Sequence, residues 1–403
     1  MKKFLLLTAL MAGAMTVNAQ SDFKVKELAK LPVTNITNYD KKFCRSGFGF
    51  GDKFFMTDRT SQQLRVFDLA TGKETAQKEI KAEVQTLGHD EVGNIILGNW
   101  TFPSTKHPEK ITFTLISADL TKEVTTNEVE TISGRGDFLG KAKGNVFGDE
   151  GATLLTSGGE QDLENKGIVC YTFTGGENPT VQFSNVFDPD QKCVNSTWAT
   201  YNYYKDVDGT DRFVYINRST PITDFTFSEG EIFSDETREY SPADRVCNKG
   251  VCNGGEIFVL GSRKFVVYGN LSAPTYLDGF TIAEIGADNK TLTTVYTKEA
   301  DNSLSRELTT QGNWLNVEVL NDKQAKLYQY FLGGYVAEYG IAIGDADTPA
   351  TSGVKGIENA PAQVVSTTYY TPAGVANKAA VKGLNIVVTK YADGSQKVVK
   401  VIK

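Results

Sequence analysis

Short runs of alternating apolar and polar residues recur along the chain from Lys41 to Gly344, and each run is bounded by glycine, asparagine or aspartate. Alternation has the two-residue period of a β-strand, and the bounding residues are those that favour turns. No stretch in this part of the sequence sustains the three- and four-residue apolar spacing of an amphipathic helix. The 23 phenylalanines and 17 tyrosines are also typical of strands. The sequence therefore predicts an all-β fold.

The runs group into units of similar length. The first unit extends from Ser46 to Ile80 and contains expected strands at Lys53–Asp58 and Gln63–Leu69. Later units begin near Leu87, Gly136, Thr197, Gly254 and Asn313. Intervals of roughly 40 to 60 residues, with about four strands in each, are typical of a β-propeller. A pair of β-sandwiches would have the same composition and is the alternative.

The two ends of this region predict how such a propeller closes. The last unit has only three expected strands, Leu315–Leu320, Ala325–Phe331 and Tyr335–Ile343. Phe23–Val33 is a further alternating segment that lies before the first unit. A blade built from both ends of the chain would remove the open sheet edges. We therefore expect residues 20–344 to form a propeller of about six blades, with seven also accommodated, in which Phe23–Val33 pairs with Tyr335–Ile343.

The first residues predict export. Lys2 and Lys3 precede an apolar run from Phe4 to Met15, and small residues follow at Val17–Ala19. This order is that of a secretory signal peptide, so we expect residues 1–19 to be removed. The run is too short to span a bilayer, which needs about 20 apolar residues, and no later run is longer. The mature chain is thus expected to have no transmembrane segment.

Charge and motifs exclude several classes of function. The net charge of −7 argues against a nucleic-acid partner, because phosphates select for an excess of lysine and arginine. The chain has two histidines, and it lacks the His-Glu-x-x-His, Gly-x-Ser-x-Gly and Gly-x-x-x-x-Gly-Lys patterns. The sequence therefore carries no catalytic signature, and we expect no cofactor.

The last forty or so residues form a separate segment. Residues 345–363 are rich in Ala, Gly, Thr, Pro, Asp and Ser and predict a linker. In residues 364–403, Tyr369 is followed by a glycine turn, and strands are expected at Lys382–Val388 and Lys397–Ile402. An ordinary accessory β-module would fit this pattern.

The aromatic-x-x-x-Gly and Gly-x-x-Ile-Val patterns of residues 364–403 resemble the C-terminal sorting domain of type IX secretion substrates. The resemblance covers about the last tenth of the chain and departs from the family at Val375, where an arginine is usual. It implies a small β-sandwich, recognition by secretion machinery at the outer membrane, and delivery to the cell surface or the medium. If the tail is no sorting signal, the periplasm is the expected location. The body correspondingly resembles secreted propellers of unknown function that accompany such tails.

Two groups of residues could form a disulfide or bind a metal ion. Cys247 and Cys252 enclose a short turn-rich loop, and in an oxidising compartment they could form a disulfide, remain free or, least favourably, bind zinc. Asp206, Asp208 and Asp211 alternate around Gly209 as calcium ligands do. The simpler interpretation of the second group is an Asp-Gly hairpin, with calcium as the alternative.

A cluster of aromatic residues is the candidate ligand site. Trp198, Tyr201, Tyr203 and Tyr204 cluster within one expected strand pair, and if the stretch is one uninterrupted strand its successive side chains point to opposite faces. One pair could pack in the core while the other stacks on a sugar ring. Packing of all four between blades is the alternative.

Two functions therefore stay open. One is a surface-exposed propeller that binds a glycan or a protein partner, and we favour it because no nucleophile, metal cage or cofactor loop is present. The other is a carbohydrate-active hydrolase or lyase that uses carboxylates or tyrosines in the axial pocket. A pair of acidic residues in a deep pocket would favour the enzyme.

We expect export to be accompanied by cleavage after Ala19. Signal peptidase cuts after small residues that follow an apolar run, so the mature chain should begin with Gln20, cyclised to pyroglutamate. Mass spectrometry of the exported protein measures this end. A mature chain that still carried Lys2 and Lys3 would rule out this route.

Overall fold

The computed structural model describes residues 22–33, 47–58, 63–80, 86–99, 110–130, 139–158, 167–184, 200–216, 221–226, 237–240, 255–269, 278–301, 313–331, 334–350, 364–371, 374–391 and 396–403. All regular elements in these ranges are strands. The described ranges accordingly contain no helix that could cross a membrane. The chain divides into two compact units, Met1–Pro349 and Ala350–Lys403, and this boundary falls inside the expected linker.

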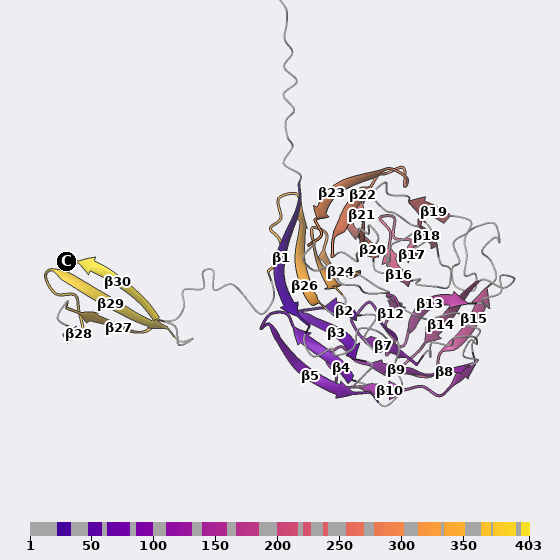
Figure 1. Ribbon diagram of the computed structural model, residues 1–403, viewed down its shortest axis with the longest axis horizontal. Coiled ribbons are helices and arrows are strands. Elements are labelled where there is room, and N and C mark those ends of the chain that lie inside the picture. Colours follow the sequence, from indigo (N-terminus) through magenta and orange to yellow (C-terminus); the bar gives the residue numbers. More distant parts are fainter. Residues whose placement is uncertain are drawn as a thin grey trace, which may run out of the picture. The chain divides into compact units, whose positions relative to one another are not determined.

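The first unit contains six four-stranded antiparallel sheets among its described residues (Figure 1). From the innermost strand outward, sheet 1 is β2 (Gly47–Phe50), β3 (Lys53–Asp58), β4 (Gln63–Asp68) and β5 (Lys73–Glu79). Sheet 2 is β6 (Thr86–His89), β7 (Ile95–Gly98), β9 (Phe113–Ile116) and β10 (Glu123–Thr125). Sheet 3 is β12 (Lys143–Gly144), β13 (Ala152–Gly158), β14 (Gly167–Phe173) and β15 (Thr180–Ser184).

Sheet 4 is β16 (Thr200–Lys205), β17 (Asp211–Ile216), β18 (Ile222–Thr226) and β19 (Thr237–Tyr240). Sheet 5 is β20 (Gly255–Leu260), β21 (Arg263–Gly269), β22 (Phe280–Ile285) and β23 (Leu292–Lys298). Sheet 6 is β24 (Asn313–Asn321), β25 (Gln324–Phe331), β26 (Tyr335–Ile343) and β1 (Phe23–Pro32). β8 (Lys110–Ile111) and β11 (Val129–Glu130) form a separate two-stranded sheet. In the sequence, β8 precedes β9 and β11 follows β10, the two outer strands of sheet 2.

Apolar clusters fill the space between each sheet and the next. Sheets 1 and 2 share one cluster, and others join sheets 2 and 3, 3 and 4, and 5 and 6. A further cluster joins sheet 4 to sheet 5 and also sheet 6 to sheet 1, where the rings of Phe54 and Tyr330 lie 5.9 Å apart. Because the last sheet packs on the first, the sheets form the closed ring of a β-propeller. The alternative of two sandwiches is wrong.

The ring closes through the first strand of the chain. β1 pairs antiparallel with β26, with Phe23 opposite Ile343 and Leu31 opposite Val336. This is the partner strand expected from the sequence. The Phe23 ring also lies 4.9 Å from the ring of Phe265 in sheet 5, so β1 contributes to the core as well as to the sheet edge. Both ends of the propeller sequence are thereby held in one sheet.

Glycines mark the crowded innermost strands. A Cβ on Gly49 of β2 would lie 2.0 Å from the Tyr328 ring, and one on Gly140 would lie 1.8 Å from the Tyr201 carbonyl oxygen. No side chain can occupy such positions, because real Cβ contacts are longer than 3.0 Å. Glycine at these two positions therefore allows neighbouring segments to approach closely.

The second unit contains one described antiparallel sheet. Its order is β28 (Ala376–Asn377), β27 (Val364–Tyr370), β29 (Leu384–Tyr391) and β30 (Gln396–Ile402). β29 and β30 correspond to the two strands expected in the tail. The resemblance implied a small sandwich, whereas the described residues of this unit supply a single layer.

Deleting residues 22–33 should destabilise the propeller strongly. The deletion exposes the edge of β26 and removes Phe23 from its contact with Phe265, so we expect the melting temperature to fall by about 5 °C or more. Differential scanning calorimetry measures this change. A chain that ends at Pro349 is the control and should melt as the full-length propeller does. Equal melting of the 22–33 deletion and the full chain would contradict the closure.

Candidate functional site

The innermost strands surround a cavity of about 520 Å³. Five of the six sheets, 1, 2, 4, 5 and 6, contribute to its wall, and Lys141 joins them from the segment that precedes β12 of sheet 3. The lining residues that carry hydrogen-bonding or charged groups include His89, Asp90, Glu91, Lys141, Tyr203, Lys205, Asp206, Glu256, Asn316, Glu318 and Asp322. Apolar surface comes from Phe50, Ile257, Phe258, Val259, Val317 and Val319. A cavity of this size and mixed lining is suited to a small organic ligand.

Side-chain amides connect the inner strands around this cavity. Asn316 Oδ1 accepts from the backbone N–H of Gly49 at 2.9 Å, and its Nδ2 donates to the Gly49 carbonyl at 2.9 Å. Asn202 Nδ2 donates to the Gly255 carbonyl at 2.7 Å, and its Oδ1 accepts from the backbone N–H of Lys141 at 2.8 Å. Inner strands of neighbouring sheets do not form a continuous ladder, and these amides satisfy backbone groups that would otherwise be unpaired. They fix the geometry of the wall.

Glu256 differs from these amides in keeping one free oxygen. Its Oε2 accepts from the backbone N–H of Val317 at 2.9 Å, whereas Oε1 is buried and has no hydrogen-bond partner among the described residues. The residue is only 2% exposed. Burial raises its pKa from 4.5 to about 7, although the charge of Lys141 and the Val317 N–H oppose the shift. Glu256 can therefore hold or release a proton near neutral pH.

His89 and Lys141 lie on neighbouring segments that form an isolated parallel bridge. His89 Nδ1 donates to the Asp90 carbonyl at 2.9 Å, so its Nε2 carries the lone pair. Burial, together with the charge of Lys141, lowers the His89 pKa to about 3, and the imidazole is neutral at physiological pH. Lys141 lines the cavity and forms no ion pair with any described residue. The cavity thus contains a cation, a neutral acceptor and a carboxyl group.

Two further carboxylates border the cavity, and each accepts hydrogen bonds from backbone. Glu318 Oε2 accepts from the Gly51 N–H at 2.9 Å and from the Tyr328 hydroxyl at 2.7 Å. Burial raises its pKa above the ordinary value despite these donors. Glu91 Oε2 accepts from the Gly144 N–H at 2.6 Å. More than one acidic residue therefore faces the same space.

The aromatic cluster expected to bind ligand is part of the core. Tyr201, Tyr203 and Tyr204 are 2%, 3% and 4% exposed, and Trp198 lies outside the described residues. Tyr201 and Tyr203 pack against sheet 3, and Tyr204 packs towards sheet 5. The alternation of faces was expected, but both faces of a propeller sheet are covered by neighbours. The three tyrosines consequently form no exposed stacking surface, although Tyr203 and Tyr204 border the cavity.

The segment with Asp206, Asp208 and Asp211, for which calcium was the alternative, is the expected hairpin, and its carboxylates have partners within the protein. Asp206 Oδ2 accepts from Arg238 Nη1 at 2.6 Å and its Oδ1 from Lys264 Nζ at 3.1 Å. Asp208 Oδ1 accepts from the Thr210 N–H at 2.9 Å, and Asp211 pairs with Lys143 and Lys205. The described residues contain no group of three acidic, histidine or cysteine side chains that could hold a metal. The hairpin interpretation is the one that the contacts support.

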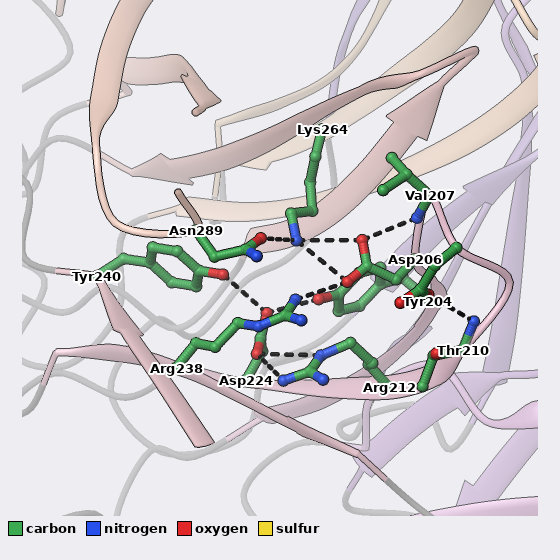
Figure 2. Close-up of polar contacts among 11 residues, drawn as sticks. Tyr204, Asp206, Val207, Thr210, Arg212, Asp224, Arg238, Tyr240, Lys264 and Asn289 are labelled. Atoms are coloured by element: carbon green, nitrogen blue, oxygen red, sulfur yellow. Dashed lines mark hydrogen bonds and ion pairs between the residues drawn. The ribbon is translucent and has the colours of Figure 1, made fainter. Parts of the chain in front are cut away.

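A buried ionic network extends from this hairpin (Figure 2). Asp224 is fully buried and accepts from Arg212 Nε at 3.1 Å, from Arg212 Nη2, and from the hydroxyls of Tyr204 and Tyr240. Lys264 of β21 donates to Asn289 Oδ1 at 2.6 Å and to Asp206, so the network connects sheets 4 and 5. Burial of the charges is tolerated because each has a partner in close contact. Tyr204 and Asp206 also line the cavity, so the network is connected to the cavity wall.

The cysteine prediction lies largely outside the described part of the chain. Cys247 and Cys252 are not among the described residues. Cys170 is described, free and buried, and burial raises its pKa to about 11. It is therefore a core thiol and not a reactive one.

Sequence analysis did not identify Glu256, Lys141 or His89. One signal could have found two of them, because Glu256 and His89 are single ionisable residues in otherwise apolar inner strands, GEIFVL and TLGH. Lys141 precedes β12 and does not lie in an apolar strand, so this signal could not have found it. Its proximity to Glu256 depends on the closed ring.

Comparison with known proteins supports the fold. No protein-family model and no curated protein matches the chain. An α-L-arabinofuranosidase from Fusarium graminearum, solved with an iminosugar inhibitor, matches at a TM-score of 0.50 and 11% identity, over 79% of this chain and 98% of that one. Regucalcin, a calcium-binding protein from Agrobacterium tumefaciens, matches at 0.42 and 9% identity, over 79% and 96% of the two chains. At 11% identity, the likeness to the arabinofuranosidase supports the β-propeller fold and shows no shared activity.

Replacing Asp224 with alanine should destabilise the protein by about 3–5 kcal/mol. The substitution leaves the buried guanidinium of Arg212 without its carboxylate, which is the costly way to break a buried pair. Urea unfolding monitored by tryptophan fluorescence measures the loss. Asp208→Ala is the matched control, since it removes only exposed hydrogen bonds to Thr210 and should cost about 1 kcal/mol or less. Equal effects of the two substitutions would contradict this role for the network.

Glu256 should make the protein less stable as the pH rises from about 4.5 to 7. In this window the folded state keeps a proton that the unfolded state has released, so the free energy of unfolding falls with pH. The full loss, reached above pH 7, is about 3 kcal/mol at 1.36 kcal/mol per pKa unit. Glu256→Gln cannot titrate and should gain this amount relative to the wild type between pH 4 and pH 8, in urea unfolding.

The exposed Glu177→Gln is the control for that comparison. It should unfold with the pH dependence of the wild type. A Glu256→Gln variant that also followed the wild-type pH dependence would show that Glu256 is not held protonated.

Proposed function

We propose that the protein binds a small hydroxyl-rich ligand, a sugar unit of a glycan, in its axial cavity. The observation that carries the proposal is Glu256, a carboxyl group in the wall of a cavity of about 520 Å³ with one oxygen left without a partner among the described residues. An unsatisfied buried polar atom costs about 1–3 kcal/mol. A ligand hydroxyl that donates to Glu256 Oε1 would recover that cost.

The other lining groups fit the same class of ligand. Lys141 supplies donors and the neutral His89 an acceptor, and hydroxyl groups can pair with both. Phe50 and Phe258 provide apolar surface for the C–H face of a sugar ring. The proposal keeps the glycan-binding hypothesis and moves its site from the buried tyrosines to the ring axis.

A catalytic function is the second candidate, and the protonation of Glu256 near pH 7 favours it. A carboxylic acid that holds its proton at neutrality suits a general acid, and Glu91 and Glu318 offer carboxylates in the same cavity. The α-L-arabinofuranosidase of the same fold is a hydrolase, although the likeness extends only to the fold. The sequence lacks a recognisable nucleophile motif, which is why binding comes first.

We also propose that the protein acts outside the cytoplasm. The signal-peptide pattern of residues 1–19 and the separate C-terminal unit, which would engage the secretion machinery, support this part of the proposal. A surface-located propeller would meet glycans or surface proteins there.

Isothermal titration against methyl glycosides of glucose, galactose, mannose, xylose and arabinose tests the binding function. At pH 8, where Glu256 is mostly ionised, we expect at least one to bind and Glu256→Gln to weaken it about tenfold, because a neutral amide is a poorer acceptor than a carboxylate. Glu177→Gln should bind as the wild type does. The absence of binding to every sugar, or unchanged binding by Glu256→Gln, would refute the proposal. Chromatography of the same mixtures for released sugar distinguishes hydrolysis from binding.

A further inference from the structure

Carboxyl groups outnumber cations in the wall of the axial cavity. Two lysines line it, Lys141 and Lys205, and the lining carboxyl groups are those of Asp90, Glu91, Asp206, Glu256, Glu318 and Asp322. His89 adds no charge near neutral pH, because burial and the charge of Lys141 lower its pKa to about 3. A ligand in this cavity therefore meets more acidic groups than basic ones.

Ion pairs with residues outside the lining neutralise only two of these groups. Asp206 pairs with Arg238 at 2.6 Å and with Lys264 at 3.1 Å, and Lys205 pairs with Asp211 at 3.0 Å. No described residue forms an ion pair with the remaining lining carboxyl groups, which are those of Asp90, Glu91, Glu256, Glu318 and Asp322. The charge of Lys141 alone opposes them within the lining.

Neutral groups donate the hydrogen bonds that these carboxyl groups accept. Asp90 accepts from the backbone N–H groups of Val92 at 3.0 Å and Val146 at 2.9 Å. Glu91 and Glu318 accept from backbone N–H groups as well. Such donors satisfy the carboxylate oxygens and leave their negative charge uncancelled. The charge acts strongly on a ligand in the cavity, because the protein wall has a lower dielectric constant than water.

Glu256 adds an observation of a different kind. Its Oε1 is buried without a partner among the described residues, and the residue is 2% exposed. A neutral hydroxyl can satisfy this oxygen, but a cationic donor forms a stronger hydrogen bond with it. Burial raises the pKa of Glu256, Asp90 and Glu318, and a cation in the cavity would favour the ionised forms that burial disfavours. The wall is therefore better matched to a positively charged ligand than to a neutral one.

Acidic groups also lie where the cavity opens to solvent. Glu91 and Asp322 are exposed lining residues, and they occupy the turns from β6 to β7 and from β24 to β25. Lys323 follows Asp322 in the chain, but it pairs with Asp345 at 2.6 Å. Carboxylates at the opening of a cavity raise the local concentration of cations and accelerate their entry.

The cation that fits this cavity is organic. The part of the chain that the structure describes contains no group of three acidic, histidine or cysteine side chains that could hold a metal ion. An ammonium group needs no such convergence, because its three donors can point to separate acceptors. It can also lie over an aromatic face, and Phe50 and Phe258 supply aromatic rings to the lining.

We propose that the sugar unit bound in the axial cavity is an amino sugar, whose protonated amino group is held by the carboxyl groups of the wall. This inference rests on the proposed function of the cavity and names the class of sugar. The hydroxyls of an amino sugar can still pair with Lys141 and His89, as those of a neutral sugar would. A uronic acid fits less well, because Lys141 alone would receive its carboxylate while the carboxyl groups of the wall repel it.

Isothermal titration at pH 7 and low salt compares each methyl glycoside of the sugar panel with its 2-amino derivative and, for the hexoses, with its 6-amino derivative. We expect one amino derivative to bind about tenfold more tightly than its parent sugar, which is nearly the same size and carries no charge. Acetylation of the amino group removes its charge and should remove this advantage. The advantage should also fall severalfold in about 0.5 M salt, because ions screen the exposed carboxylates.

Substitutions that change charge and keep size locate the effect. Glu91→Gln with Asp322→Asn removes two charges where the cavity opens, so the advantage of the amino sugar should fall to about threefold or less. Asp149→Asn with Asp208→Asn is the matched control, since it removes two charges from exposed residues outside the lining, and the advantage should persist. Lys141→Met removes the opposing cation and should increase the advantage. Unchanged melting temperatures check that the variants fold.

The outcomes separate the two proposals. Equal binding of amino and parent sugars overturns the amino-sugar inference and leaves the sugar site standing. An advantage that persists in the Glu91→Gln, Asp322→Asn variant, or that falls equally in the control, also overturns it, because the amino group would then be held elsewhere or by the net charge of the protein. A smaller advantage in Lys141→Met, or tighter binding of the corresponding uronic acid, shows an anionic ligand and has the same consequence. If no sugar of any kind binds, the sugar site and the inference fail together.

Discussion

The burial of both faces of every sheet against its neighbours is the constraint on which this structure depends. It requires apolar side chains at both the odd and the even positions of each strand, because these positions face opposite sides of the sheet. The inner and middle strands provide them, as the nearly continuous burial of β21 and β26 illustrates. Sheet 6 must also pack on sheet 1, and β1 makes this closure possible by completing sheet 6. The axial cavity is the space that remains where the inner strands converge.

The same constraint limits where polar groups can lie. Buried charges between the sheets are paired, as Arg212 with Asp224 and Asp206 with Lys264. Inner-strand amides are likewise occupied, because Asn202 and Asn316 bond to neighbouring backbone. Glu256 departs from this pattern, since one oxygen is buried without a partner among the described residues. The free energy cost of a buried polar atom without a partner is tolerated where function requires it. For that reason the proposed ligand site is placed at Glu256.

Much of the fold could be predicted from sequence because its signals are local. Strand alternation and turn residues placed β3 at its observed bounds and β4 to within one residue, and the surplus strand at the N-terminus predicted the pairing of β1 with β26. The site could not be predicted in the same way. Tyr203 and Tyr204 were correctly assigned to opposite faces, yet an alternating pattern cannot say whether the outward face meets solvent or another sheet.

The sequence by itself determined the strand periodicity, the turns and the unit spacing, since each depends on residues near one another in the chain. Only the tertiary structure decided that Glu256, Lys141 and His89 share one cavity. Glu256 belongs to sheet 5, His89 to sheet 2 and Lys141 to the segment that precedes β12, and closing the ring brings them together. Their pKa shifts follow from that arrangement, because burial and the charge of Lys141 act through space and not along the chain.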